Sequence, residues 1–491
     1  MAAIITEKFR VHNAKQFKED FGESASSTYV FIGRSNPWAV DTSPPTPVNG
    51  TSEEVDAWSD MTALKKVGSA DVSHGLTRYD WTSGVKYDEY AHDISATNTS
   101  SATAATSLFA SRFYVMTDEY QVYKCLRTGR DASGATVNST VKPTGTSATA
   151  LVETSDTGIG TGRGYVWKYM YTVTASDTIK FVTNDFLPVK TLGAQDKIDG
   201  DIQGLGTSAA NDGSSQWDVE NGAIDGGVHH AVVTAAGSGY TNGTYNEVPV
   251  VGNGSGAKAT VVIAGGAVSR VTFFGTGSAY GSGYTVADIK IATTTTNLSG
   301  IGSGSGAIVK VIISPKVGHG ADPVQELGGN HVIVNSRLEF GEGSGDFPTD
   351  NDFRRIGLVQ DPFSTGVTVA TAASLAAYSK MTVSDASNLK VDDIIRSASA
   401  DASGVANSRI VSITGNVVSH LPVVDSAGGF TNFAAGNDVY LGSSDEGTVS
   451  SVNAAFPEVV KHSGQIMYIE NRGAVTRAAD QIEDIKLIIE M

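Results

Sequence analysis

The chain has 491 residues, more than one hydrophobic core usually organises, so several domains are expected. Hydrophobic residues make up 40% of the chain and charged residues 18%, which is the balance of a globular protein, and 55 glycines predict many turns between strands. The formal net charge of −17 would repel both a phosphate backbone and an anionic membrane surface. We therefore expect neither nucleic acid nor membrane as a partner.

The single cysteine, Cys125, excludes an internal disulfide framework and is typical of a small buried side chain in a chain made in a reducing compartment. The apolar run at residues 2–5 is too short, and its surroundings too charged, for a signal peptide. No apolar run approaches the roughly 20 residues that cross a bilayer. We expect the chain to be made and kept in a cytoplasm, unless assembly carries it out inside a particle.

Two short amphipathic helices are expected near the start of the chain. Ala14, Phe17 and Phe21 recur at helical spacing, with Asn13 as the cap and Gly22 as the stop. A second helix is predicted to begin at the capping-box pattern of residues 51–54.

Most other elements are expected to be strands. Stretches rich in β-branched and aromatic residues, bounded by turn residues, predict strands at 29–32, 113–116, 120–126, 165–173 and 332–334. Alternating apolar and polar residues at 485–490 are typical of a half-buried terminal strand. Two segments rich in Ser, Thr, Ala and Gly, 95–107 and 131–164, are predicted to be long loops.

An internal repeat lies in the middle of the chain. Gly-Ser-Gly-Tyr-Thr occurs at 237–241 and again at 281–285, and Gly-Ser-Gly-Ala occurs at 254–257 and again at 304–307. Each Gly-Ser-Gly-Ala leads into an apolar strand. The segment therefore predicts a compact β module of two similar units, inserted into the rest of the chain.

A second module is predicted where short strands follow one another closely, at 366–441, and a small β-barrel is expected there. The predicted fold class is mainly β and multi-domain: a β-sandwich-like core with few short helices that carries two inserted small β modules. In this division the core comprises 1–235, 331–365 and 451–491, the glycine-rich repeat module 236–330, and the barrel module 366–450.

The motifs of common catalytic and metal sites are not found in the sequence. No serine has glycines two residues before and two residues after it, and the only adjacent histidines, His229 and His230, would point to opposite faces of a strand. Paired carboxylates such as Asp88 and Glu89 lie in polar sequence, which favours a solvated face over an acid/base pair. We therefore predict no catalytic residue, no metal, no cofactor and no small-molecule substrate.

Several sequence motifs resemble those of one protein family, both in their residues and in their order along the chain. They are Thr-Glu-Lys-Phe-Arg at 6–10, Phe-Ile-Gly-Arg-Ser-Asn-Pro-Trp at 31–38, Arg-Tyr-Asp-Trp at 78–81, Val-Tyr-Lys-Cys-Leu at 122–126, Gly-Tyr-Val-Trp-Lys-Tyr at 164–169 and the C-terminal run 461–472, with a weaker echo at 352–356. This pattern resembles the baseplate wedge proteins of contractile-tail phages of the T-even type.

The resemblance implies a structural, non-enzymatic and mostly β subunit in the tail baseplate of a virion. It also implies that the chain forms a homodimer, contacts other baseplate wedge subunits, and takes part in the rearrangement that triggers sheath contraction. The two modules look like insertions into this pattern.

Candidate protein-interface residues follow these motifs. Arg34 and Trp38 lie on either side of Pro37, and a guanidinium and an indole are side chains that dominate interface hot spots. The alternative, that Trp38 only fills the chain's own core, is equally compatible with the sequence. The predicted interface residues are Arg34, Pro37, Trp38, Trp58, Arg78, Trp81, His462, Asn471 and Arg472.

Two rival functions remain open. A receptor- or carbohydrate-binding tail protein is suggested by tyrosines on glycine turns that would stack on sugars, namely Tyr240, Tyr245, Tyr280 and Tyr284. A cell-wall hydrolase is a weaker rival because it would need carboxylates or a zinc triad from residues that form no motif.

Overall fold

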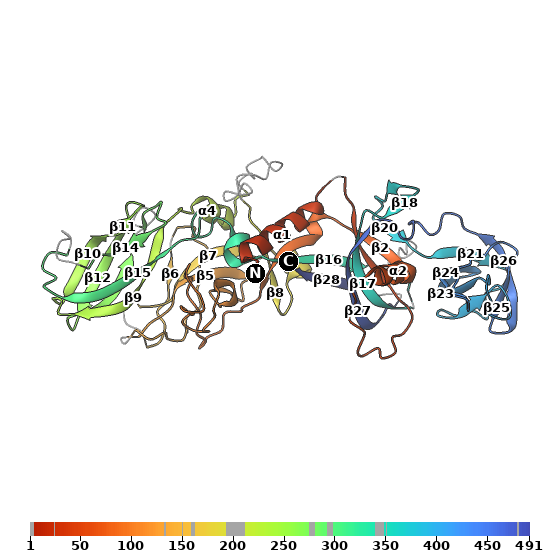
Figure 1. Ribbon diagram of the computed structural model, residues 1–491, viewed down its shortest axis with the longest axis horizontal. Helices are drawn as coiled ribbons and strands as arrows, with labels where there is room; N and C mark the ends of the chain where they lie inside the picture. Colours follow the sequence, from red (N-terminus) through yellow and green to blue (C-terminus); the bar gives the residue numbers. More distant parts are fainter. Residues whose placement is uncertain are drawn as a thin grey trace. The chain divides into compact units, whose positions relative to one another are not determined.

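The computed structural model describes residues 4–23, 25–131, 134–149, 151–158, 163–192, 212–273, 280–291, 298–338, 348–349, 351–478 and 481–491. The chain forms two compact units. The first comprises Met1–Lys15, Ser73–Val332 and Ile489–Met491, and the second comprises Gln16–Val72 and Ile333–Ile488. Strands predominate in both units, so the predicted mainly β, multi-domain fold class is confirmed (Figure 1).

The helices are short. They are α1 (Glu7–Asp20), α2 (Thr51–Asp60), α3 (Ala175–Phe181), α4 (Ser215–Asn221) and α5 (Pro323–Leu327), with 3₁₀ turns at Ser69–Asp71 and Leu108–Ala110. The predicted cap Asn13 is wrong, because Thr6 accepts a hydrogen bond from the amide of Phe9 and the helix starts about two turns earlier. The predicted capping box of α2 is also wrong, since the N-cap residue is Gly50 and no side chain accepts a capping hydrogen bond there.

The first unit contains a four-stranded sheet in the order β4-β5-β7-β6, formed by β4 (Tyr114–Met116), β5 (Gln121–Arg127), β6 (Val152–Glu153) and β7 (Val166–Thr172). Trp167 stacks on Tyr165 with ring centres 5.6 Å apart, and Cys125 is a buried free thiol in the same cluster, as expected. A further pair, β3 (Val72–Thr77) with β8 (Phe186–Val189), is antiparallel. The predicted loop 131–164 contains β6 and lies partly outside the described residues.

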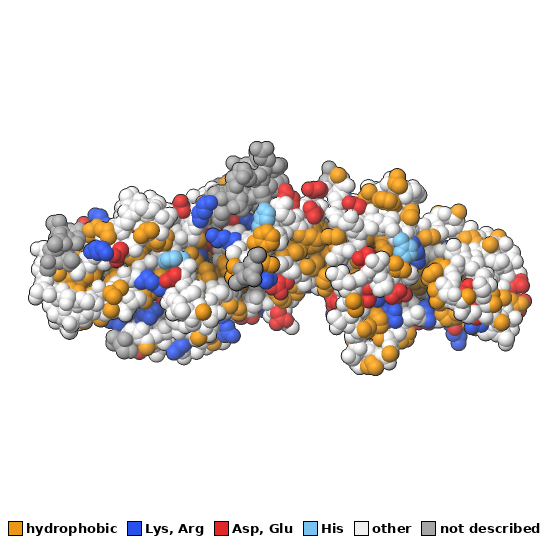
Figure 2. All heavy atoms as spheres, viewed as in Figure 1, with side chains coloured by type: hydrophobic (Ala, Val, Ile, Leu, Met, Phe, Trp, Pro, Cys, Tyr) orange, Lys and Arg blue, Asp and Glu red, His pale blue; other side chains and the backbone are white. Residues whose placement is uncertain are grey.

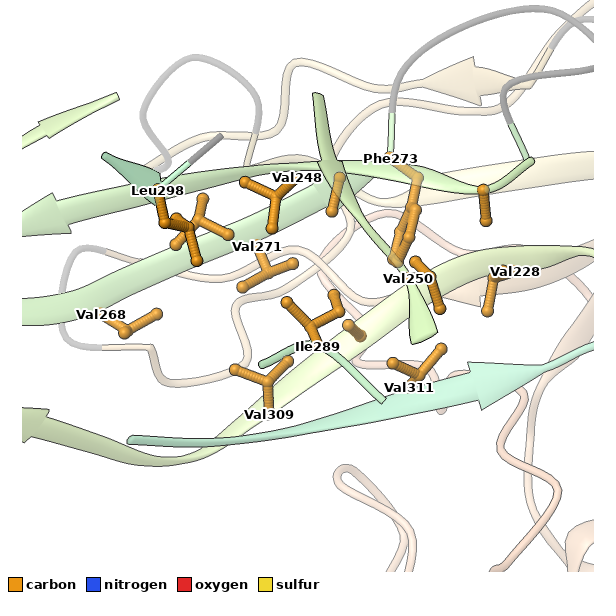
Figure 3. Packing of buried hydrophobic residues seen from close by; sticks show 14 of the residues in the cluster. Val228, Val248, Val250, Val268, Val271, Phe273, Ile289, Leu298, Val309 and Val311 are labelled. Carbon is orange, nitrogen blue, oxygen red and sulfur yellow. The ribbon is translucent and has the colours of Figure 1, made fainter. Parts of the chain in front are cut away.

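The glycine-rich segment forms two facing sheets. One has the order β10-β12-β13 and the other β11-β14-β15-β9, from β9 (Val228–Ser238), β10 (Gly243–Pro249), β11 (Val251–Gly252), β12 (Lys258–Ala264), β13 (Ala267–Phe273), β14 (Ala287–Asp288) and β15 (Ser305–Ile313). Their inner side chains point toward one another, with Val248 and Val271 on one side and Val309 and Val311 on the other (Figure 3).

The two sequence repeats pack across one another in this module. The Tyr240 ring of the first repeat lies on Gly304 of the second, where a Cβ would come within 2.4 Å of the ring. The Tyr284 ring of the second repeat lies in the same way on Gly254 of the first, again at 2.4 Å. Only glycine leaves room for each ring, which explains why the Gly-Ser-Gly-Ala motif is repeated along with the tyrosine.

The second unit is built on an antiparallel five-stranded sheet in the order β20-β2-β1-β17-β27. Its strands are β1 (Thr28–Gly33), β2 (Met61–Val67), β17 (Asp352–Gln360), β20 (Ser374–Ala376) and β27 (Gln465–Thr476), and a hairpin joins β18 (Phe363–Thr365) to β19 (Thr368–Val369). Helix α2 packs Ala57 and Trp58 against Tyr29 and Phe31 of this sheet's core. β16 (His331–Leu338) and β28 (Glu483–Glu490) are neighbours in another sheet.

The predicted barrel is a closed six-stranded barrel. Its strands are β21 (Ser379–Val383), β22 (Ile394–Arg396), β23 (Asn407–Thr414), β24 (Val417–Val423), β25 (Asp438–Leu441) and β26 (Ser444–Val452), in the order β21-β24-β23-β22-β25-β26. Ile395, Ile410, Val418 and Val439 fill its interior. The sequence did not predict β26, because this strand is mostly polar and exposed and forms by pairing with β21 and β25.

Replacing Gly254 with alanine should unfold the repeat module more easily. The new methyl group would meet the Tyr284 ring and the Ser282 carbonyl oxygen at about 2.5 Å, and overpacking of this kind costs about 1–3 kcal/mol. Urea unfolding of the full chain, followed by circular dichroism, measures the loss. Gly243→Ala is the matched control in the same module, since its nearest neighbour is at 3.5 Å. Equal stability of the two variants would contradict the crossed packing.

Candidate protein interface

Arg34 and Trp38 form one fixed group on the second unit. The Arg34 guanidinium carbon lies 3.7 Å from the centre of the Trp38 ring, and Trp38 donates its indole N–H to the backbone carbonyl of Arg472 at 2.8 Å. The backbone amide of Trp38 donates to Asp41 at 2.7 Å. Pro37 is exposed, and Trp38 is half-buried. An aromatic side chain is thus held in one orientation with part of its surface open to solvent.

Two buried arginines of β17 hold this group in place. Arg354 makes ion pairs with Asp41 at 3.0 Å and with Asp352 at 2.9 Å, and it donates to the Ser35 carbonyl at 2.6 Å. The Arg354 side chain is only 5% exposed. Because charge-assisted bonds of a planar guanidinium fix several acceptors at once, Arg354 anchors both ends of the segment that carries Trp38.

Arg355 contacts helix α2 and strand β27 directly, and it is linked to the segment at Pro45 through Asn471. Its guanidinium lies 2.7 Å from the Glu53 carboxylate and 3.5 Å from that of Asp60, both on α2. It also donates to the side-chain oxygen of Asn471 on β27 at 3.0 Å. Asn471 in turn donates to the Pro45 carbonyl at 3.1 Å. One buried cation therefore ties helix α2 to an edge strand.

Burial and charge oppose each other in this network. Burial raises the pKa of Asp60 and lowers the pKa of Arg355, while the attraction between the two groups works against both shifts. The pKa of Asp41 is lowered chiefly by its hydrogen bond from Arg354. The ion pairs therefore favour the charged forms that hold the network together.

The structure brings together Arg34, Pro37, Trp38, Asn471 and Arg472 of the predicted residues. Arg472 is exposed and lies 3.4 Å from Glu470.

Trp58 and His462 lie together elsewhere on the second unit, with ring centres 6.2 Å apart. Trp58 is 3% exposed and fills the chain's own core, whereas His462 is exposed at a left-handed position with φ of 61°. Burial and the neighbouring Lys461 lower the pKa of His462.

Arg78 and Trp81 belong to the first unit. Arg78 pairs with Asp80 at 2.9 Å and donates to the Thr183 carbonyl at 2.7 Å. Trp81 donates its indole N–H to Ser139 at 3.1 Å and packs against a buried aromatic cluster. Both side chains support their own unit.

Sequence reasoning missed Arg354 and Arg355 as the centre of the group. Their signal was the weak echo at 352–356, where two adjacent arginines stand beside an apolar strand. The predicted solvated face at Asp88 and Glu89 is wrong. Asp88 is buried and accepts the amides of Ala102 and Arg112 at 2.7 and 3.0 Å, since buried carboxylates need such donors.

Among the described residues, no cluster of three or more His, Cys, Asp or Glu side chains is placed to hold a metal ion. In the same part of the chain, none of the helices has the length and apolar character needed to span a membrane.

Part of the chain is similar in sequence to a family of phage proteins. Residues 3–201 match the protein family described as "Bacteriophage T4, Gp8", so this part of the chain is similar to that phage protein family. Of the predicted interface residues, the match contains Arg34, Pro37, Trp38, Trp58, Arg78 and Trp81.

A particular relative is the baseplate wedge protein gp8 of Enterobacteria phage T4. It is 26% identical over 210 residues, which cover 38% of this chain and 60% of the relative. The resemblance to a baseplate wedge subunit is therefore confirmed, and the similarity supports a location in the virion tail baseplate. The likeness of the C-terminal run 461–472 lies outside the matched family range and stays a prediction.

Removing the Arg355 charge should destabilise the second unit strongly. Arg355→Met leaves the Glu53 and Asp60 carboxylates beside an apolar side chain, and breaking a buried pair in this way costs about 3–5 kcal/mol. Arg472→Met is the control, because its exposed pair contributes little and the change should stay within about 0.5 kcal/mol. Urea unfolding compares the two variants, and a similar small loss in both would refute the anchoring role.

Proposed function

We propose that the chain is a structural subunit of a phage tail baseplate wedge. The observation that carries this proposal is the match of residues 3–201 to the family of the T4 protein. The chain is mainly β, and its two modules have separate hydrophobic cores. This is consistent with a structural subunit that acts through its contact surfaces rather than through a reactive centre.

In this function the chain pairs with a second copy of itself and binds other baseplate wedge subunits. Its contacts with them take part in the rearrangement that triggers sheath contraction. The chain acts without enzymatic activity, cofactor or small-molecule substrate. Support comes from the matched relative, whose name places it in a baseplate wedge.

The contact surface is centred on Trp38 and includes Arg34, Pro37, Asn471 and Arg472. Trp38 is held by a cation–π contact and a hydrogen bond, so little side-chain entropy would be lost when a partner covers it. Tryptophan and arginine are the residue types on which interface free energy concentrates. Trp58, Arg78, Trp81 and His462 are further candidates whose described contacts lie within the chain itself.

The two modules are insertions into the wedge core in this proposal. The family match ends at residue 201, before the repeat module of 236–330, and the closed barrel lies wholly within 366–452. Each module has a hydrophobic core of its own. An element with its own core can be added in a loop at little cost to the surrounding sheet.

The receptor-binding alternative loses its main support. The tyrosines expected on exposed turns are buried, with Tyr240 6%, Tyr280 7% and Tyr284 1% exposed, and Tyr245 is half-buried. Their rings fill the module rather than facing solvent, so they are not a platform for sugars. The expectation of exposed stacking tyrosines is wrong because the turn glycines leave room for the rings inside.

Light scattering tests the proposed function. The purified chain should be a dimer alone and should enter a larger complex when mixed with the other wedge subunits of the same virus. Trp38→Ala should weaken that complex by at least about 2 kcal/mol, as hot-spot truncations do. Phe430→Ala removes an aromatic side chain that is 58% exposed on the barrel module and should leave binding unchanged. A monomer that ignores these subunits would overturn the proposal.

A further inference from the structure

A basic cavity lies in the first unit, where the repeat module meets the ends of β5 and β7. The end of β5, described residues that follow it and Arg163 form one wall, and β9 and β13 form the other. Its volume is about 120 Å³, enough for about four waters at roughly 30 Å³ each. A tetrahedral oxyanion is of this size. Figure 2 shows Lys and Arg side chains (blue) on the face over these strands.

Four arginines line the cavity, and none of its described lining residues is acidic. Arg127 forms an ion pair with Glu153 at 2.6 Å, and Arg130 forms one with Glu89 at 2.8 Å. Burial raises the pKa of Glu89, which lies 3.2 Å from His230, but His230 and Arg130 hold this pKa well below its usual range. Glu153 also attracts the Arg270 guanidinium, so two carboxylates lie beside the four guanidinium groups.

Arg163 and Arg270 are the other two arginines of the cavity. Arg163 donates to the Asp131 backbone carbonyl at 2.6 Å and to the Ser269 hydroxyl at 3.3 Å, which are neutral acceptors. The carboxylate of Asp131 accepts the Ala135 amide at 3.0 Å. Burial lowers the pKa of Arg270, and the nearby Arg163 and Arg127 lower it further, as expected where like charges converge.

Thr272 gives independent evidence of a ligand. This residue lines the cavity and is only 4% exposed. Its hydroxyl has no hydrogen-bond partner among the described residues. A buried hydroxyl without a partner costs about 1–3 kcal/mol, so an acceptor that enters the cavity would relieve that cost.

We propose that this cavity binds a small oxyanion of phosphate size, free or as the phosphate group of a larger molecule. Arg163 and Arg270 would donate the charge-assisted hydrogen bonds, and the Thr272 hydroxyl would donate a third. The fork of an arginine matches the spacing of phosphate oxygens. The site is independent of the baseplate role, because the wall formed by β9 and β13 lies outside the matched family range.

Calorimetric titration of the full chain with inorganic phosphate, at constant ionic strength, tests the site. We expect saturable binding, and at least about tenfold weaker binding for Arg163→Gln and for Arg270→Gln, since each loses a charge-assisted bond. Arg409→Gln is the matched control, because this arginine lies on β23 of the barrel and contacts Asp392. Thr272→Val keeps the shape of the buried side chain and should also weaken phosphate binding.

Glucose 1-phosphate is titrated in parallel to distinguish the sources of the oxyanion. Tighter binding of the ester, with the same dependence on Arg163 and Arg270, supports the site and assigns it to a phosphorylated saccharide. Binding of inorganic phosphate alone supports it as a site for the free ion. No saturable binding of either probe, or binding that the arginine and Thr272 variants leave unchanged, overturns the proposal.

Discussion

Two adjacent buried arginines of β17 are the constraint on which the second unit depends. Arg354 binds the segment that carries Trp38, and Arg355 binds helix α2 and the edge strand β27. A buried guanidinium without partners would cost several kcal/mol, so each of these stretches must present its acceptor at the right place. Residues far apart in sequence, such as Glu53 and Asn471, are thereby fixed to one another.

The ion pairs of Arg354 and Arg355 do not involve the barrel, which lies between β20 and β27 in the sequence. The barrel leaves the five-stranded sheet after β20 and the chain returns to it as β27, so the strands that contact Arg355 are separated in sequence but not in space. The barrel fills its interior with its own apolar residues, and the repeat module in the first unit does the same. Modules of this kind alter the surface of a unit without touching the ion pairs of its sheet.

The sequence predicted what depends on local pattern. The strands at 29–32 and 120–126, the repeat module and the barrel follow from β-branched runs, turn glycines and spacing. It did not predict what depends on distant partners. The polar strand β26 exists because two neighbours pair with it, and Asp88 is buried because backbone amides from a later loop reach it. The sequence named Trp38 as a candidate interface residue but not the arginines that position it, since the burial of a charged side chain cannot be predicted from the pattern of one strand.

The crossed packing of the tyrosines makes the repeat a closed pair. Most repeat proteins are open arrays, in which each unit contacts only its neighbours and further units can be added at either end. Here the Tyr240 ring of the first repeat covers Gly304 of the second, and the Tyr284 ring of the second repeat covers Gly254 of the first. Both glycine sites are therefore already occupied by a tyrosine ring. The tyrosine of a third copy would have no uncovered glycine to pack on, and the tyrosine of a single copy would lack the glycine of a second repeat. The module can therefore be gained or lost by a chain only as a whole.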